Sequence, residues 1–316
     1  MNKKSTPELV IMIGPPGAGK SYVSKEKYRG YTYLSSDEIR KELFNDINYQ
    51  GDNGRVFYEM RTRAIDELEE GRNVVYDATN MSRKDREGIL KECPAWVNKV
   101  ACVVWAPIND CVLRDAKRDR TVGLSVIKKM LMRYEAPFWD EGFDDIVVVM
   151  NTISHEWCFN NYYDSVFGEM HIPHDNPHHT YDIYQHSLAA AEHFNEAYCG
   201  TVYGLDADGN ILVDAGFNTK VLDVYFAILY HDIGKPFVKT FTNMKGETTN
   251  VAHYYGHAGV GAWMSYGLLG ESRKIYVPYL ISHHMDPYLE TKYYQRLPEF
   301  IQVDIDVLHQ ADLSAH

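Results

Sequence analysis

The stretch Leu9-Val-Ile-Met-Ile-Gly-Pro-Pro-Gly-Ala-Gly-Lys-Ser21 decides the fold of the first part of the chain. Residues 9–13 form a continuous apolar run, which is typical of a strand buried on both faces of a parallel sheet. The run that follows fits Gly-x-x-x-x-Gly-Lys-Ser, in which backbone N–H groups and a helix N-terminus converge on phosphate groups. We therefore expect a loop that binds ATP or another nucleoside triphosphate through Gly14, Gly17 and Gly19. Lys20 would lie against the β- and γ-phosphates, and Ser21 would ligate Mg²⁺.

Similar apolar runs recur along the first half of the chain, at residues 31–34, 73–76, 99–105 and 145–149. Helical patterns separate them, notably at residues 53–70 and 107–120. Strands that alternate with helices predict an α/β domain with a parallel sheet, right-handed crossovers and helices on both faces.

The second half differs from the first in composition. With 316 residues, the chain is long enough for two domains of ~150 residues each. The formal net charge is −12, the whole acidic excess lies after residue 155, and all 14 histidines lie at or after His155. Apolar residues recur there at helical spacing, in residues 181–198, 219–230, 257–269 and 276–284. We expect an α/β domain at 1–155 and an all-α domain at 156–316.

Charge and cysteine content narrow the class of protein. A net charge of −12 excludes the broad basic face of a non-specific nucleic-acid binder. Polynucleotide contacts would then come from bound metal and from a local cluster formed by Arg114, Lys117, Arg118 and Arg120. Five cysteines without Cys-x-x-Cys spacing predict free thiols in a reducing compartment. With no signal peptide or long apolar run in the sequence, we expect a cytoplasmic protein without a membrane partner.

Polar side chains follow two of the expected strands. Asp37 comes shortly after residues 31–34, at the edge where active sites of parallel sheets gather. It is a candidate general base for an acceptor hydroxyl, and the alternative role is a helix N-cap. Asp77 ends another strand. Arg114 and Arg118 stand at i, i+4, which places them on one helix face, either to grip a triphosphate or as part of a solvated charged helix.

These pieces together resemble the 5′-hydroxyl polynucleotide kinase domain of bacteriophage and bacterial end-healing enzymes. The resemblance covers residues 9 to about 150. Four segments carry it, namely residues 14–21, Ser36-Asp37 with Arg40, Asp77-Ala-Thr-Asn80, and the Arg114/Arg118 segment with residues 126–137. It implies that Asp37 is the general base, that Lys20 and Arg118 act on the donor phosphates, and that Arg114 helps to bind them. It also implies that the acceptor is held by Arg40, Asp77 and Asn80. Kinases of small metabolites and of aminoacylated RNA share the same combination.

The histidines of the second half suggest a metal site. His231-Asp232 ends the apolar run of residues 224–230, and an adjacent imidazole and carboxylate can bind one metal while the carboxylate bridges to a second. Further imidazoles and a carboxylate lie in or beside apolar helical segments, where a buried polar group needs a partner. They are His186, His257, His283-His284 and Asp312.

This order resembles the HD phosphohydrolase superfamily over residues 172–316. The local sequences of residues 176–181 and 256–261 are similar to those of HD domains appended to tRNA nucleotidyltransferases. The resemblance implies one or two divalent transition metals (Mn²⁺, Fe²⁺, Ni²⁺, Co²⁺ or Cu²⁺). The first would bind His186, His231, Asp232 and Asp312, and the second Asp232, His257 and His283. The sequence leaves open whether His283 or His284 is the ligand, and whether Lys235 contacts a substrate phosphate or is a surface lysine.

A kinase fused to a phosphohydrolase predicts an enzyme that heals the ends of broken RNA, including tRNA, or of DNA. It would phosphorylate a 5′-hydroxyl with ATP and remove a 2′,3′-cyclic or 3′-phosphate, leaving the sealing step to a separate ligase. If the chain is phage-encoded, it would work in the host cytoplasm. The alternative function is a small-metabolite or nucleoside kinase fused to an HD nucleotide phosphodiesterase or phosphatase.

Overall fold

The computed structural model describes residues 6–49, 51–118, 120–152, 159–175, 180–198, 219–289 and 291–315. The chain divides into two compact units, Met1–Glu156 and Trp157–His316. Residues 176–179, which belong to the first of the two segments that resemble HD domains, lie outside the described part of the chain.

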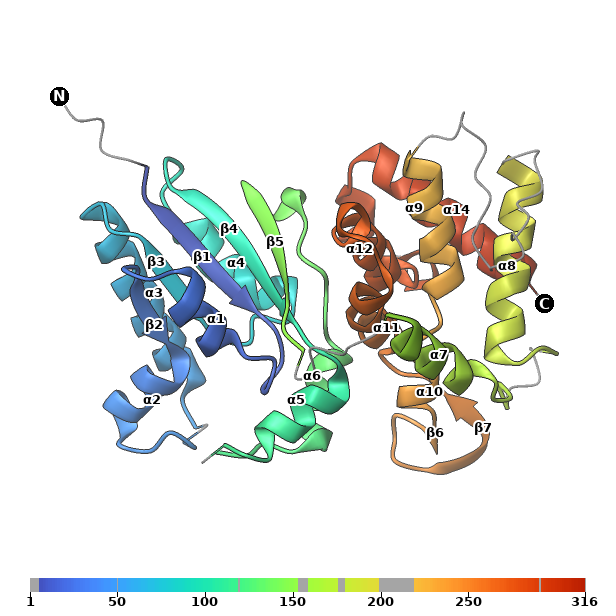
Figure 1. Cartoon of the computed structure of the whole chain (residues 1–316), viewed down its shortest axis with the longest axis horizontal. Coiled ribbons are helices and arrows are strands. Elements are labelled where there is room, and N and C mark those ends of the chain that lie inside the picture. The colour runs from blue at the N-terminus through green and yellow to red at the C-terminus, as the bar shows by residue number, and fades with distance from the viewer. Residues whose placement is uncertain are drawn as a thin grey trace. The chain divides into compact units, whose positions relative to one another are not determined.

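Unit 1 is built on a parallel sheet of five strands, in the order β2-β3-β1-β4-β5 (Figure 1). The strands are β1 (Glu8–Ile13), β2 (Thr32–Ser35), β3 (Val74–Asp77), β4 (Asn98–Trp105) and β5 (Asp145–Met150). Each lies within two residues of the run that predicts it, because a strand covered on both faces needs an unbroken apolar sequence. The predicted α/β parallel sheet is confirmed.

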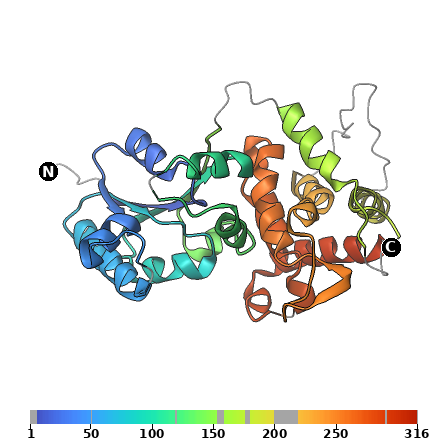
Figure 2. The ribbon, with the colours of Figure 1, turned by 90° about the horizontal axis from the view of Figure 1, so that it is seen from below.

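Helices cover both faces of this sheet (Figure 2). They are α1 (Lys20–Lys27), α2 (Ser36–Phe44), α3 (Asn53–Glu69), α4 (Arg83–Glu92), α5 (Ile108–Asp115) and α6 (Leu124–Leu131). Under α1, the core packs Val10, Met12, Val75 and Cys102. Since every strand runs in the same direction, their carboxyl ends meet at one edge, and the polar residues that follow β1, β2 and β3 gather there.

One helix differs from its prediction. The pattern of residues 107–120 predicts a single helix, but α5 ends at Asp115. The carboxylate of Asp115 is fully buried and accepts the backbone N–H groups of Val122 (3.0 Å) and Gly123 (2.9 Å), which folds the chain back. Arg114 and Arg118 therefore do not share a face of one helix, and that prediction is wrong.

Unit 2 is mainly helical, with one two-stranded antiparallel sheet of β6 (Thr240–Thr242) and β7 (Thr248–His253). That hairpin is a departure from the all-α expectation, because its short alternating strands lack a long apolar run. The main helices are α7 (Phe159–Met170), α8 (Ile183–Tyr198), α9 (Thr219–Tyr230), α10 (Lys235–Val238), α11 (His257–Ser265), α12 (Tyr276–His283), α13 (Asp286–Leu289) and α14 (Glu299–Ser314). Helix α9 packs against α8, α12 and α14, and α11 packs against α12.

Among the described residues, no helix is both long and apolar enough to cross a membrane. The thiols of Cys93, Cys102 and Cys111 are free and buried. The other two cysteines, Cys158 and Cys199, lie outside the described part of the chain.

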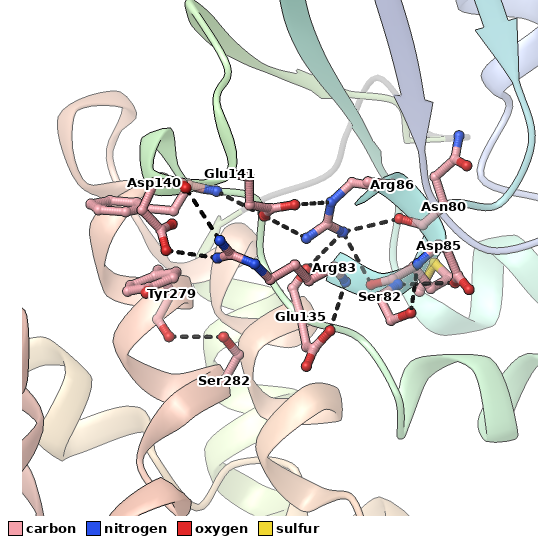
Figure 3. Close-up of polar contacts among 12 residues, drawn as sticks. Asn80, Ser82, Arg83, Asp85, Arg86, Glu135, Asp140, Glu141, Tyr279 and Ser282 are labelled. Carbon is pink, nitrogen blue, oxygen red and sulfur yellow. Dashed lines mark hydrogen bonds and ion pairs between the residues drawn. The ribbon is translucent and has the colours of Figure 1, made fainter. Parts of the chain in front are cut away.

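A buried ion pair fixes the loop that follows β3 (Figure 3). The guanidinium of Arg86 is fully buried and contacts both carboxylate oxygens of Glu141, at 2.7 and 2.8 Å. It also donates to the carbonyls of Asn80 (3.0 Å) and Glu135 (3.1 Å). Arg86 thus holds in place the loop between β3 and α4.

We expect Glu141→Gln to lower the free energy of unfolding by about 3 kcal/mol, because it leaves a buried guanidinium without a counter-charge. Urea unfolding of the full chain measures the change. The control is Glu87→Gln, which breaks a surface pair with Lys91 in which both side chains are at least half exposed. Equal effects of the two variants would contradict a special role for the buried pair.

Candidate functional site

The glycine loop of unit 1 connects β1 to α1. Gly17 has a φ of +80°, and a Cβ added there would lie 2.0 Å from the carbonyl oxygen of Cys111, so only glycine fits. The Lys20 amine donates to the carbonyls of Gly14 (2.9 Å) and Pro15 (3.2 Å). Burial lowers the pKa of Lys20, although Asp77 pulls it upward. A phosphate chain at this helix N-terminus would place a negative counter-charge beside the buried Lys20 amine.

Asp77, at the end of β3, lies beside the start of α1. Its Oδ2 accepts hydrogen bonds from the hydroxyls of Ser21 (2.9 Å) and Tyr33 (2.5 Å). Burial, followed by the charge of Asp77, raises the pKa of Tyr33. A serine hydroxyl and a carboxylate are oxygen ligands of the kind that Mg²⁺ takes beside a bound triphosphate. Sequence reasoning missed Tyr33, since nothing in its strand pattern marks it.

Asp37 lies in the first turn of α2, but it is not the N-cap, because Ser35 fills that position and accepts from the Asp37 N–H at 3.3 Å. Its Oδ1 accepts from Arg40 (2.8 Å) and from Arg120 (2.6 Å). Arg118 lies 3.7 Å from Oδ2. The carboxylate is therefore held by guanidinium groups that come from two distant segments.

Arg114 contacts the back of the glycine loop. It donates to the carbonyls of Gly17 (3.3 Å), Ala18 (3.2 Å) and Asn151 (2.8 Å). The loop is thus fixed to the end of β5, and part of the guanidinium's hydrogen-bonding capacity is used within the protein.

A cavity lies beside the glycine loop, and Asn80 is not among its lining residues. This differs from the expectation that Asn80 binds the acceptor. Its side chain is 2 % exposed and donates to the carbonyl of Met12 at 2.8 Å. Asn80 ties the loop after β3 to β1. Of the predicted acceptor contacts in unit 1, the structure leaves Arg40 and Asp77 at the cavity.

One cavity of about 440 Å³ collects the remaining residues. It brings together the glycine loop, the carboxylates of Asp37 and Asp77, and four arginines, namely Arg40, Arg114, Arg118 and Arg120. A phosphate-binding loop, a carboxylate at the opposite wall and a set of cations between them can hold a triphosphate and position a hydroxyl against it.

Two groups of side chains in unit 2 could hold a metal ion. The first is His186, His231 and Asp312, and the second is Asp232, His257 and His284. Within each group the candidate ligand atoms lie within 4.8 Å of one another. Five of these six residues are buried, and the side chain of Asp312 is 14% exposed. Asp232 links the groups, because its Oδ2 lies 3.2 Å from His231 Nε2 and its Oδ1 lies 3.5 Å from His257 Nε2.

Each imidazole in the two groups is oriented by a backbone carbonyl. The Nδ1 atoms of His186, His231, His257 and His284 lie 2.8, 2.6, 2.8 and 2.7 Å from the carbonyls of Ala315, Ile228, Tyr254 and Ile281. A carbonyl accepts only, so it favours the proton on Nδ1 and a lone pair on Nε2. This is the arrangement that metal-binding histidines require.

The polar atoms at the centre fit a cation. His257 Nε2 and His284 Nε2 lie 3.0 Å apart, and two lone pairs at that distance repel unless a positive charge lies beside them. The Oδ1 of Asp232 and the Nε2 of His231 are buried without a hydrogen bond among the described residues, whereas the Oδ2 of Asp232 has the Lys235 amine at 2.6 Å. Buried polar atoms of this kind need a partner, and a divalent ion would supply one.

The pKa values reflect how closely these charges pack. Burial raises the pKa of Asp232 and Asp312, but the neighbouring imidazoles outweigh it and hold both well below the usual range. Burial lowers the pKa of His257 to about 4 and that of His284 to about 3. Burial also lowers the pKa of His231, but the carboxylates of Asp232 and Asp312 outweigh the effect of burial and raise this pKa to about 10. Ionised carboxylates and the neutral imidazoles of His257 and His284 are donors for a borderline metal ion, and His231 would have to release its proton to join them.

His284, and not His283, belongs to the second group. His283 Nδ1 lies 2.8 Å from the carboxylate of Asp286, and its ring packs between Tyr279 and Tyr293. Adjacent residues at the end of α12 point about 100° apart around the helix axis, so only one of the two can face Asp232. The expectation of His283 as ligand is corrected to His284.

Lys235 lies at the same centre. Its amine is 2.6 Å from Asp232 Oδ2 and 5.5 Å from the ring centroid of Tyr254. At 9 % exposure it is not the surface lysine of the alternative reading. Gly234 permits this packing, because a Cβ there would lie 2.2 Å from the carbonyl oxygen of His257.

The match to a protein family lies in unit 1. Residues 9–137 match the AAA domain family. Together with the glycine loop and the parallel sheet, this match identifies a P-loop kinase-type domain, which implies ATP and Mg²⁺. A curated relative, "Transcription factor bHLH140" of Arabidopsis thaliana, is 29% identical over 161 residues, which cover 49% of this chain and 17% of the relative. The chain thus spans less than a fifth of that relative's length.

Three solved structures resemble part of the chain. The first, "Structure of the Pnkp1/Rnl/Hen1 RNA repair complex", is 23% identical with a TM-score of 0.38, covering 42% of this chain and 45% of that chain. A gluconokinase from Sinorhizobium meliloti 1021 is 20% identical with a TM-score of 0.33, covering 47% and 84%. Shikimate kinase from Acinetobacter baumannii is 18% identical with a TM-score of 0.31, covering 46% and 84%. With TM-scores this low, the similarity to these structures does not indicate the activity of this protein.

Proposed function

We propose that this protein heals the broken ends of nucleic acid, namely RNA, including tRNA, or DNA. Unit 1 would phosphorylate a 5′-hydroxyl with ATP, and unit 2, as an HD-type phosphohydrolase, would remove the 2′,3′-cyclic or 3′-phosphate. The observation that supports the proposal is that one chain holds two groups of side chains whose chemistry suits phosphate transfer and phosphate hydrolysis. One is the cavity between the glycine loop and Asp37, and the other is the pair of metal-binding groups around Asp232.

In the kinase unit, each cavity residue has a task that its position supports. Lys20 and the N-terminus of α1 would hold the β- and γ-phosphates, and Ser21 with Asp77 would orient Mg²⁺. Asp37 would take the proton from the acceptor hydroxyl while its oxygen attacks the γ-phosphorus and ADP leaves. Arg118, which is 42% exposed and near Asp37, would neutralise the charge that develops on the transferred group.

Arg40 supports a phosphorylated acceptor. It is 5 % exposed, lies beside Asp37 and forms part of the cavity wall. Its guanidinium is fixed by Asp37 and by Asn53 (3.1 Å), and these two contacts do not use all of its N–H donors. Such a group suits the phosphate that follows the 5′-nucleoside of a polynucleotide, since Arg binds phosphate through charge-assisted bonds.

In the hydrolase unit, His186, His231 and Asp312 would hold one metal ion, His257 and His284 a second, and Asp232 would bridge them. Bound divalent metals supply Lewis acidity and charge neutralisation for phosphoester hydrolysis. Among the described residues at this centre, Lys235 is the lysine or arginine closest to the ligands, at 2.6 Å from Asp232. It would stabilise the negative charge of the substrate phosphate. The products, a 5′-phosphate and a 3′-hydroxyl, are the ends that a separate ligase requires.

The deciding experiment uses an RNA oligonucleotide with a 5′-hydroxyl and a 2′,3′-cyclic phosphate, incubated with ATP, Mg²⁺ and a transition metal. Mass spectrometry reads both ends. We expect phosphate gained at the 5′ end and lost at the 3′ end, with Lys20→Ala abolishing only the first reaction and Asp232→Ala only the second. Phosphorylation of nucleosides or sugars without reaction on the oligonucleotide would overturn the proposal in favour of a metabolite kinase.

A further inference from the structure

A second cavity, of about 670 Å³, lies beside the kinase cavity in unit 1. It is lined by residues from the last turn of α2 and the loop after it, and by residues of the segment that follows α5. Arg118 and Arg120 line both cavities, so the two adjoin each other. We call this second cavity the basic groove.

The charge of the basic groove contrasts with that of the unit around it. Four of its eight lining residues are cations, namely Lys41, Lys117, Arg118 and Arg120. One is an acid, Asp46, whose carboxylate already accepts the N–H of Asn48 at 2.8 Å. Over residues 1–155 positive and negative charges balance, whereas the lining of the groove holds four cations and one acid.

Lys41 and Lys117 are not explained by the fold. Both are exposed, and neither forms an ion pair with a carboxylate in the part of the chain that the structure describes. Arg118 and Arg120 hold Asp37, whereas the two lysines lie farther from the glycine loop and do not line the kinase cavity. A donor triphosphate on the loop would leave them without a partner.

The amides of Asn45 and Asn48 complete the lining. Cations alternating with amide donors suit a chain of phosphates and sugar hydroxyls. A small metabolite would need only the first cavity. A basic groove that adjoins it would suit an acceptor with several phosphates in line.

We propose that the basic groove binds the sugar-phosphate backbone of a single-stranded polynucleotide, on the 3′ side of the nucleotide whose 5′-hydroxyl is phosphorylated. This inference rests on the proposed kinase function and names its acceptor. It places Lys41 and Lys117 on phosphates beyond the one that Arg40 would hold. Binding at this groove is sequence-independent, because it involves the backbone only.

The test compares acceptors of increasing length with the full chain, namely adenosine 3′-monophosphate, a dinucleotide and 5′-hydroxyl RNAs of four and ten nucleotides. For the wild type we expect kcat/KM to rise with length. Lys41→Ala/Lys117→Ala should cut the preference for the ten-nucleotide RNA over adenosine 3′-monophosphate by about tenfold or more, through KM. The dependence of log KM on log salt concentration should become shallower by about 1 to 1.5, since two phosphate contacts are lost.

The matched control is Lys25→Ala/Lys84→Ala, which removes two exposed lysines that line neither cavity. It should keep both the length preference and the salt slope. Unchanged length preference in Lys41→Ala/Lys117→Ala, with wild-type phosphorylation of RNA, would overturn the groove while leaving the proposed function intact. Absence of phosphorylation on every RNA by the wild type would instead overturn the proposed function.

Discussion

Asp37→Asn is expected to lower the rate of 5′-phosphorylation by about 10²- to 10⁴-fold, the range that general base catalysis contributes. The reason is that an amide cannot take the proton of the acceptor hydroxyl, although it keeps nearly the same shape. ATP binding should persist, because the glycine loop and Lys20 are untouched. Steady-state kinetics and equilibrium binding of a fluorescent ATP analogue measure the two quantities separately.

The control for Asp37 is Glu38→Gln. Glu38 is the next residue on α2, but it is exposed and does not line the cavity, so its loss should leave the rate unchanged. If Asp37→Asn kept a rate near that of the wild type, Asp37 would serve only as the counter-ion of Arg40 and Arg120. If it lost ATP binding as well, the carboxylate would act by holding the arginines, and the base would have to be sought elsewhere.

Asp232→Asn is expected to have the second large effect, confined to unit 2. Its carboxylate lies between both metal-binding groups, so the amide would weaken both sites at once. We expect the metal content, measured by elemental mass spectrometry, to fall. We also expect 3′-end hydrolysis to drop below about one hundredth of the wild-type rate, because mutation of residues that only hydrogen-bond to a metal ligand already lowers activity by about 10- to 100-fold. Phosphorylation at the 5′ end should stay unchanged.

Two neighbouring histidines provide the matched comparison. His284→Ala should lose metal and hydrolysis, whereas His283→Ala should keep the metal, because His283 contacts Asp286 instead. The reverse order would show that the helix end carrying them is rotated relative to the arrangement described above. Treatment with a chelator should abolish hydrolysis in the wild type, and added Mn²⁺ or another transition metal should restore it.

Local sequence was enough for much of the fold. Residues 9–13 and the glycine loop predict β1 and the start of α1 closely, because a strand buried on both faces needs an unbroken apolar run and the loop needs its glycines. The helix α9 has the bounds that its apolar spacing predicts. Where a side chain competes with this spacing, the prediction fails, and the buried Asp115 that ends α5 is the example.

The candidate sites divide in the same way. Motifs by themselves were enough to select Lys20, Ser21 and the His231-Asp232 pair as candidates, since the residue types and their local spacing mark them. Only the tertiary structure decided that Arg120 contacts Asp37 across 83 positions, that Asp312 meets His186 across 126, and that His284 replaces His283. It also turned Asn80 away from the cavity. The physical reason is that periodicity fixes how a segment lies against its own neighbours, whereas the convergence of side chains depends on how distant segments pack together.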